Sequence, residues 1–214
     1  MAGKIKTVVI LVHGYNVSNP EQTVNKLRPY FEELDCLVET FTYGHTNLFQ
    51  VRWNNPRLAK RLAMRTAYWH AKGYQIIVVG HSNGCAIAHL GARNHEFYAD
   101  VMLAINPALE KKLNPCRAAK KSVVLFNEGD QPVRWARRLS RIIPKSWFDA
   151  RPWGEMGAVG YKGNCLHIKN IDSGAMAPKA DGHSAVFHGK QAPVHLPHAA
   201  NSAVLALPAK PLVF

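Results

Sequence analysis

The chain has 214 residues, of which 47% are hydrophobic and 9% aromatic, and this composition excludes a wholly disordered protein. Its formal net charge of +13 means that the surface attracts anions, whether nucleic acid, acidic lipid headgroups or small anionic substrates. No apolar run approaches the roughly 20 residues that cross a bilayer. We expect a cytoplasmic protein without a signal peptide or a transmembrane segment.

Six segments have the composition of strands, and helical patterns separate them. The runs around Val8, Ile76 and Val123 are continuously apolar rather than alternating, which is typical of strands covered on both faces. The expected strands are residues 6–12, 37–43, 74–80, 101–106, 122–127 and 165–171.

The helical patterns carry recognisable start and stop residues. Asn19 with Pro20, and Asn55 with Pro56, each predict an N-cap followed by proline in the first turn, and Gly73 predicts the end of the second helix. Strand and helix therefore alternate. This order predicts a doubly wound α/β domain with a mostly parallel sheet of about six strands and helices on both faces. The expected helices are residues 19–34, 54–73, 83–95 and 132–143.

Prolines gather near the end of the chain, at Pro193, Pro197, Pro208 and Pro211. We therefore expect one α/β domain over residues 1–190, followed by an extended tail, residues 191–214, that packs on the same domain. No internal repeat and no second domain is expected.

Cysteine and histidine spacing gives no metal pattern. Four cysteines lie far apart without a CxxC pair, so we expect reduced thiols and neither a structural metal nor a cofactor. His195 and His198 have HxxH spacing, but Pro197 lies between them, and we expect no helix to place both on one face.

The segment Gly80-His81-Ser82-Asn83-Gly84 lies where a buried strand gives way to a helix. A serine in so sharp a turn is expected to have φ > 0, with its hydroxyl exposed above the sheet edge at the positive end of the helix. Side chains two residues before and after would collide, so we expect both glycines to be required. Ser82 is thus a candidate nucleophile.

Two features make the sequence resemble the α/β-hydrolase superfamily, and the resemblance covers nearly its whole length. They are the turn at residues 80–84, which we call the elbow, and the segment "VVILVHGYN" at the first strand. The resemblance implies the superfamily's chain order of serine, acid and histidine. It assigns the acid to Asp130, in a G-D-x-x-V turn, with Glu128 as the rival at the end of the strand. It assigns the histidine to His183 in a Gly-His turn, ahead of His167 and His188.

The resemblance also implies an oxyanion hole built from the backbone N–H groups of Tyr15 and Asn83, and structural roles for His13 and His81. Only residues 107–121 separate two of the expected strands, which is too short for a helical lid. We therefore expect a minimal member without a cap domain. Residues 132–163 could lean over the site, with four aromatic residues that either line an acyl pocket or belong to the core: Trp135, Trp147, Phe148 and Trp153.

The expected activity is serine hydrolysis of carboxylic esters through an acyl-enzyme, without cofactor or metal. An acyl thioesterase or a lipase with the same triad is a first alternative. A catalytically silent fold that binds nucleic acid or protein through its basic surface is a second. The expected partner is a small ester or acyl substrate, anionic or lipid-like, with weak association to anionic membranes as a hypothesis and no nucleic acid. Two helices have cationic faces, and each is either an ordinary surface helix with its apolar stripe in the core, which we favour, or a surface for anionic membranes or substrates. The cationic residues are Arg57, Lys60, Arg61 and Arg65 in one helix, and Arg134, Arg137, Arg138 and Arg141 in the other.

Overall fold

The computed structural model describes residues 6–14, 23–44, 50–140, 153–174, 182–188 and 192–207. Six parallel strands form one sheet in the order β2-β1-β3-β4-β5-β6. The expected doubly wound sheet is therefore confirmed. The strands are β1 (Thr7–Val12), β2 (Leu37–Phe41), β3 (Gln75–His81), β4 (Ala99–Ile105), β5 (Ala119–Phe126) and β6 (Ile168–Asp172).

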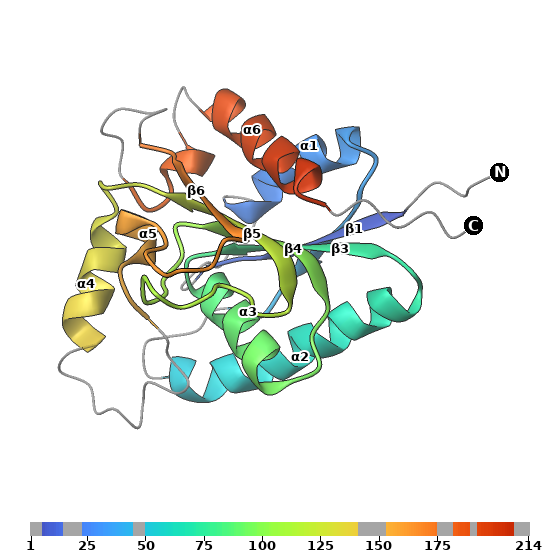
Figure 1. Ribbon diagram of the computed structural model, residues 1–214, viewed down its shortest axis with the longest axis horizontal. Helices are drawn as coiled ribbons and strands as arrows, with labels where there is room; N and C mark the ends of the chain where they lie inside the picture. Colours follow the sequence, from blue (N-terminus) through green and yellow to red (C-terminus); the bar gives the residue numbers. More distant parts are fainter. Residues whose placement is uncertain are drawn as a thin grey trace.

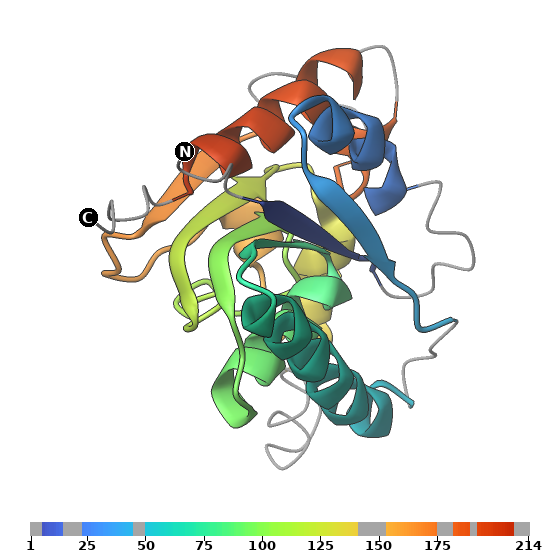
Figure 2. The same cartoon turned by 90° about the vertical axis from the view of Figure 1, so that its right-hand side faces the viewer.

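Helices cover both faces of the sheet (Figure 1). One face carries the long helix α2 and helix α3, and the opposite face carries α1 and α6, so the sheet is the middle of three layers (Figure 2). Shorter helices α4 and α5 lie near the carboxyl end of β5. The helices are α1 (Arg28–Glu33), α2 (Val51–Ala71), α3 (Asn83–Asn94), α4 (Gln131–Ser140), α5 (Met156–Val159) and α6 (Ala192–Leu205), with short 3-10 helices at Val24–Leu27 and Ala185–Phe187.

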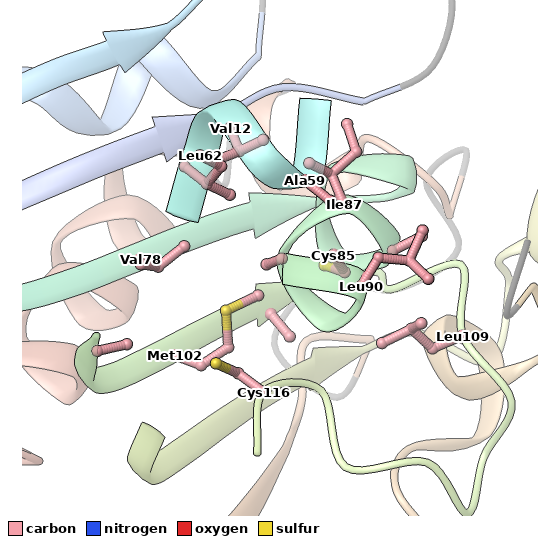
Figure 3. Close-up of a cluster of buried hydrophobic side chains, with 14 of the residues drawn as sticks. Val12, Ala59, Leu62, Val78, Cys85, Ile87, Leu90, Met102, Leu109 and Cys116 are labelled. Atoms are coloured by element: carbon pink, nitrogen blue, oxygen red, sulfur yellow. The ribbon is translucent and has the colours of Figure 1, made fainter. Parts of the chain in front are cut away.

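Alternating side chains of each central strand pack into two separate cores. Val8, Ile10 and Val12 of β1 point toward α2 and α3, whereas Val9 and Leu11 point toward α1 and α6. Continuous apolar strands are therefore required, as the sequence indicates, because both faces are buried. Figure 3 shows the first core, where residues of α2 and α3 interlock above the strands.

Helix α2 begins earlier than expected. Asn55 is not its N-cap and Pro56 is not in its first turn, because the helix starts at Val51. The N–H groups of Trp53 and Asn54 already donate to Gln50 O, and Val51 is fully buried in the core. Burial of Val51 favours the extra turn, and it places Asn55 inside the helix.

The tail prediction is wrong for residues 192–205, which form α6 rather than an extended chain. Apolar side chains recur at helical spacing and are buried against the sheet, which stabilises a helix even though Pro197 lies within it. His195 and His198 therefore do share a helix, but His195 is buried and His198 is exposed. The buried residues of this stripe are Leu196, Ala199, Ala200 and Ala203.

The predicted cap Asn19-Pro20 lies outside the described residues, and the rest of that segment forms the 3-10 helix and α1. All four cysteines are free thiols. None of the described helices is long and apolar enough to cross a membrane.

Candidate active site

Ser82 occupies the turn between β3 and α3. It has φ 51° and ψ −117°, a backbone conformation that non-glycine residues rarely adopt. Its N–H donates to Ile105 O at 3.1 Å, and its carbonyl accepts the N–H groups of Cys85 at 3.1 Å and Ala108 at 3.2 Å. These three bonds to neighbouring elements hold the strained turn in place. The predicted positive φ is therefore present.

The flanking glycines are required for a different reason from the one expected. A Cβ on Gly84 would lie 2.4 Å from Val12 O and 2.7 Å from His13 O, and a Cβ on Gly80 would lie 2.9 Å from Cys85 N. The glycines thus avoid backbone atoms, not each other's side chains. Gly84 lets the first turn of α3 lie directly against the end of β1.

Three of the predicted site residues meet at the carboxyl edge of the sheet. His183 Nε2 lies 2.8 Å from Ser82 Oγ, and His183 Nδ1 lies 3.0 Å from each carboxylate oxygen of Asp130. The tautomer that satisfies both contacts carries its proton on Nδ1 and leaves Nε2 free to accept the serine proton. The side chains are 101 and 53 residues apart in sequence, so only the fold brings them together.

Asp130 is fully buried, whereas its rival Glu128 is exposed. The Asp130 carboxylate accepts the Val133 N–H at 3.1 Å and the Asn106 side-chain amide at 3.1 Å, in addition to the His183 contacts. A buried carboxylate needs such donors, because desolvation disfavours its charge. The donors therefore satisfy the carboxylate oxygens and fix the group beside the imidazole.

Asn106, which the sequence analysis missed, follows β4 and has φ 42°. Its fully buried amide group also lies 3.3 Å from Gly182 O and 3.4 Å from Gly157 O. It therefore connects the acid turn, the loop that carries the histidine, and helix α5. Its position at the carboxyl end of a central strand was the available sequence signal.

The backbone of His183 is also fixed. His81 Nε2 lies 3.0 Å from His183 O, and burial together with the neighbouring His183 charge lowers the pKa of His81 to about 3. His81 is therefore neutral and donates this bond, which agrees with the structural role that the resemblance implies. Gly182 allows a close approach as well, because a Cβ there would lie 2.2 Å from Gly129 C. Of the other histidines, His167 lies just before β6 and is exposed, and His188 is exposed beside Lys26.

Asn83, the first residue of α3, is 1% exposed, and its side chain takes part in a buried polar network. Its amide pairs with the amide of Asn55, and its Oδ1 also accepts the indole N–H of Trp153 at 3.0 Å. Tyr15, the other expected oxyanion donor, lies outside the described residues. His13, two residues before it, stacks on Tyr43 with ring centroids 3.9 Å apart.

The aromatic residues expected over the site differ in their placement. Trp153 is buried, Trp135 is 58% exposed, and Trp147 and Phe148 lie outside the described residues. Within the described part of the chain, no three His, Cys, Asp or Glu side chains gather as metal ligands. Cys85 is buried beneath the elbow (Figure 3), where its thiol donates to Gly80 O and burial raises its pKa.

No family model and no curated protein sequence matches this chain. Solved structures do resemble it. A protein from Xanthomonas campestris pv. campestris, named as a presumed hydrolase of the α/β superfamily, has a TM-score of 0.51 and 18% identity over 94% of this chain and 100% of its own. Carboxyl esterase 2 from Tuber melanosporum has a TM-score of 0.58 and 12% identity, over 95% and 80% of the two chains. Dienelactone hydrolase from Anabaena variabilis has a TM-score of 0.56 and 12% identity, over 96% and 88%.

The chain has the α/β-hydrolase fold. Within this fold, Ser82 occupies the turn after β3, Asp130 the turn after β5, and His183 a turn after β6. The described residues between β4 and β5 contain no helix, so no cap domain is inserted there. The α/β-hydrolase fold is thus present in a minimal form, and its carboxyl edge is the candidate active site.

Proposed function

We propose that this protein is a serine hydrolase that cleaves carboxylic esters through an acyl-enzyme. One observation carries the proposal, the unbroken chain of contacts from Ser82 Oγ to His183 at 2.8 Å and from His183 to Asp130 at 3.0 Å. The hydroxyl lies on a strained turn that a purely structural serine would not need. Solved structures of the same fold include proteins named as esterases, which adds support at the level of the fold.

In the proposed reaction, Ser82 Oγ attacks the ester carbonyl carbon while His183 Nε2 takes the hydroxyl proton. The carbonyl π electrons move to the oxygen and form a tetrahedral oxyanion. When the oxyanion collapses, the bond to the alkoxy oxygen breaks, and His183 gives its proton to the departing alcohol. Water then repeats the sequence on the acyl-enzyme, releases the acid and restores Ser82.

Asp130 orients the imidazole and stabilises its charged form, because its fully buried carboxylate lies 3.0 Å from Nδ1. The N–H of Asn83, at the start of α3, is a proposed donor to the oxyanion, together with the N–H of Tyr15. Each such donor contributes about 3–4 kcal/mol to the stabilisation of the transition state. The unpaired N–H groups at the helix start add a favourable field.

The proposed substrate is a small acyl ester. Exposed arginines on α2, among them Arg57 and Arg61, support a preference for anionic or lipid-like esters and weak association with anionic membranes. A thioester would react by the same steps, because the leaving thiolate takes the place of the alkoxide. Esters and thioesters with the same acyl group, compared over increasing chain length, would identify the preferred leaving group and pocket depth.

The deciding experiment is labelling with a fluorophosphonate probe, which phosphonylates an activated serine. Wild-type protein should label, Ser82→Ala should abolish the label, and His183→Ala should slow it by about 10³-fold or more. Ser202→Ala is the matched control, since Ser202 lies on α6 away from the triad and should label like wild type. A folded wild-type protein that fails to label would exclude the enzyme, and nucleic-acid affinity that falls steeply with salt would then favour the silent binding fold.

A further inference from the structure

The side chain of Asn83 is held at both of its polar atoms. Its Oδ1 accepts from Asn55 Nδ2 at 2.9 Å and from Trp153 Nε1 at 3.0 Å, while its Nδ2 donates to Asn55 Oδ1 at 3.0 Å. Asn55 is 0% exposed, Asn83 is 1% exposed and Trp153 is 8% exposed. This is a closed, fully buried set of hydrogen bonds, in which no amide atom is left without a partner.

The position of Asn55 is unexpected for a polar residue. Asn55, Ala59 and Leu62 lie on one face of α2, and Ala59 and Leu62 belong to the core that also contains Ile87 of α3 (Figure 3). A helix face that packs on a neighbouring helix is normally apolar throughout. A buried asparagine without hydrogen-bond partners would destabilise the protein there. Its pairing with Asn83 therefore accounts for a polar residue at this position.

Holding this amide matters because of where Asn83 lies. Asparagine near the start of a helix readily turns its side chain toward local backbone groups. Here the amide is fixed toward α2 and Trp153, away from the first turn of α3. The peptide between Ser82 and Asn83 is thereby held in one orientation, and this peptide carries the N–H proposed as an oxyanion donor.

Tyr43 holds the chain that follows β1. Its one hydroxyl proton is shared between His13 O at 2.7 Å and Gly14 O at 2.9 Å, and this bifurcated bond fixes the chain just before Tyr15. Burial raises the pKa of this hydroxyl, which keeps it protonated as a donor. Buried hydrogen bonds therefore hold both segments from which the oxyanion donors are expected, through Tyr43 at one segment and through the Asn83 side chain at the other.

We propose that Asn55 and Trp153 are positioning residues for the oxyanion hole and act through the side-chain amide of Asn83. The inference rests on the proposed function, since it needs an oxyanion to form at Ser82. An oxyanion donor acts only when it lies about 2.7–3.1 Å from the developing charge. A network that fixes the Asn83 peptide therefore affects the transition state more than the bound ester.

The test compares Trp153→Phe, which removes the indole N–H but keeps an aromatic ring, with Asn55→Leu, which removes both amide bonds. We expect kcat for a nitrophenyl ester to fall about 10-fold in Trp153→Phe and about 100-fold in Asn55→Leu. KM should stay within about twofold in both. The midpoint of the acidic limb of the pH–rate profile should not move, because neither variant touches His183 or Asp130.

Two matched controls separate positioning from general destabilisation. Trp69→Phe removes an indole N–H that donates to Glu39, and Thr66→Val removes a buried hydroxyl from the same helix as Asn55. Both should lower the unfolding temperature but retain wild-type kcat. Folded Asn55→Leu and Trp153→Phe proteins with wild-type kcat would overturn the inference while leaving the hydrolase intact. A wild-type protein that neither labels nor turns over ester would overturn both proposals.

Discussion

Backbone strain at single residues is concentrated around the candidate site. Among the described residues, three that are not glycine have positive φ, namely Asp35, Ser82 and Asn106. Ser82 carries the candidate nucleophile, and the amide of Asn106 contacts the carboxylate that orients the base. Such conformations cost about 1–3 kcal/mol each and persist only where surrounding contacts enforce them. Two such residues in one site therefore support the proposal that this geometry serves catalysis.

Gly84→Ala tests how closely the start of α3 must approach the end of β1. The new Cβ would lie 2.4 Å from Val12 O, which is backbone that cannot move without distorting β1. We expect a loss of about 3 kcal/mol in the free energy of unfolding, together with loss of fluorophosphonate labelling. Urea unfolding followed by tryptophan fluorescence would measure the loss.

Gly44→Ala is the matched control for this substitution. Gly44 has φ 71°, but no described atom lies within 4 Å of the position that the added methyl group would take. Only backbone strain of about 1 kcal/mol is therefore expected. Equal losses in the two variants would show that the approach of α3 to β1 is not a tight constraint.

At the scale of elements, the site is built where strand ends meet. β1 and β3 are neighbours, and the strands that follow them in sequence, β2 and β4, lie on opposite sides of this pair, so the strand order reverses here. Ser82 follows β3 there, while Asp130 and His183 follow β5 and β6. Because the strands are parallel, their carboxyl ends lie at the same edge of the sheet, and all three residues meet there. No local sequence feature could bring them together.

Helix α6 is held by its apolar face rather than by helix propensity. Leu196 is 4% exposed, and Leu205 at the end of the same helix is 83% exposed. Leu196→Ala should lower the free energy of unfolding by about 2–4 kcal/mol, because it leaves a cavity against the sheet. Leu205→Ala should change it by less than about 0.5 kcal/mol. Similar losses from both, measured by urea unfolding, would mean that α6 does not pack as described.

For the whole molecule, several buried neutral histidines set the response to acid. Burial lowers the pKa of His13, His81 and His89, and that of His81 falls to about 3. Between pH 6.5 and 3 the unfolded chain binds a proton at His81 that the folded protein does not. The stability contributed by His81 is therefore complete above pH 6.5 and declines as the pH falls.

The His81 contribution predicts a slope of about 1.4 kcal/mol per pH unit, or roughly 2 kcal/mol lost between pH 7 and pH 5. Urea unfolding at a series of pH values measures the total slope, to which His13 and His89 add. His81→Gln keeps a donor near His183 O but cannot titrate, so its slope should be smaller by about this amount. An unchanged slope would show that His81 is protonated in the folded protein.

Local sequence patterns were sufficient to predict the order of the elements and the sharp turn at Ser82. Continuous apolar runs at β1, β3 and β5 require burial on both faces, and Gly80 and Gly84 around Ser82 require a sharp turn after a strand. These are local properties, because composition and backbone sterics act over a few residues. The choice of Asp130 and His183 came from the superfamily resemblance, and their catalytic roles remain predictions that the labelling experiment tests.

The side chains that surround the triad could not be predicted from local patterns, because they depend on how the elements pack. Asn55 resembles a helix cap in the sequence, but burial of Val51 extends α2 and turns Asn55 toward Asn83. The prolines near the end of the chain suggest an extended segment, but the apolar face of α6 gains more from packing on the sheet than proline costs. Both outcomes depend on contacts between residues far apart in the chain. These contacts form, and stabilise the two helices, only when the sheet is present.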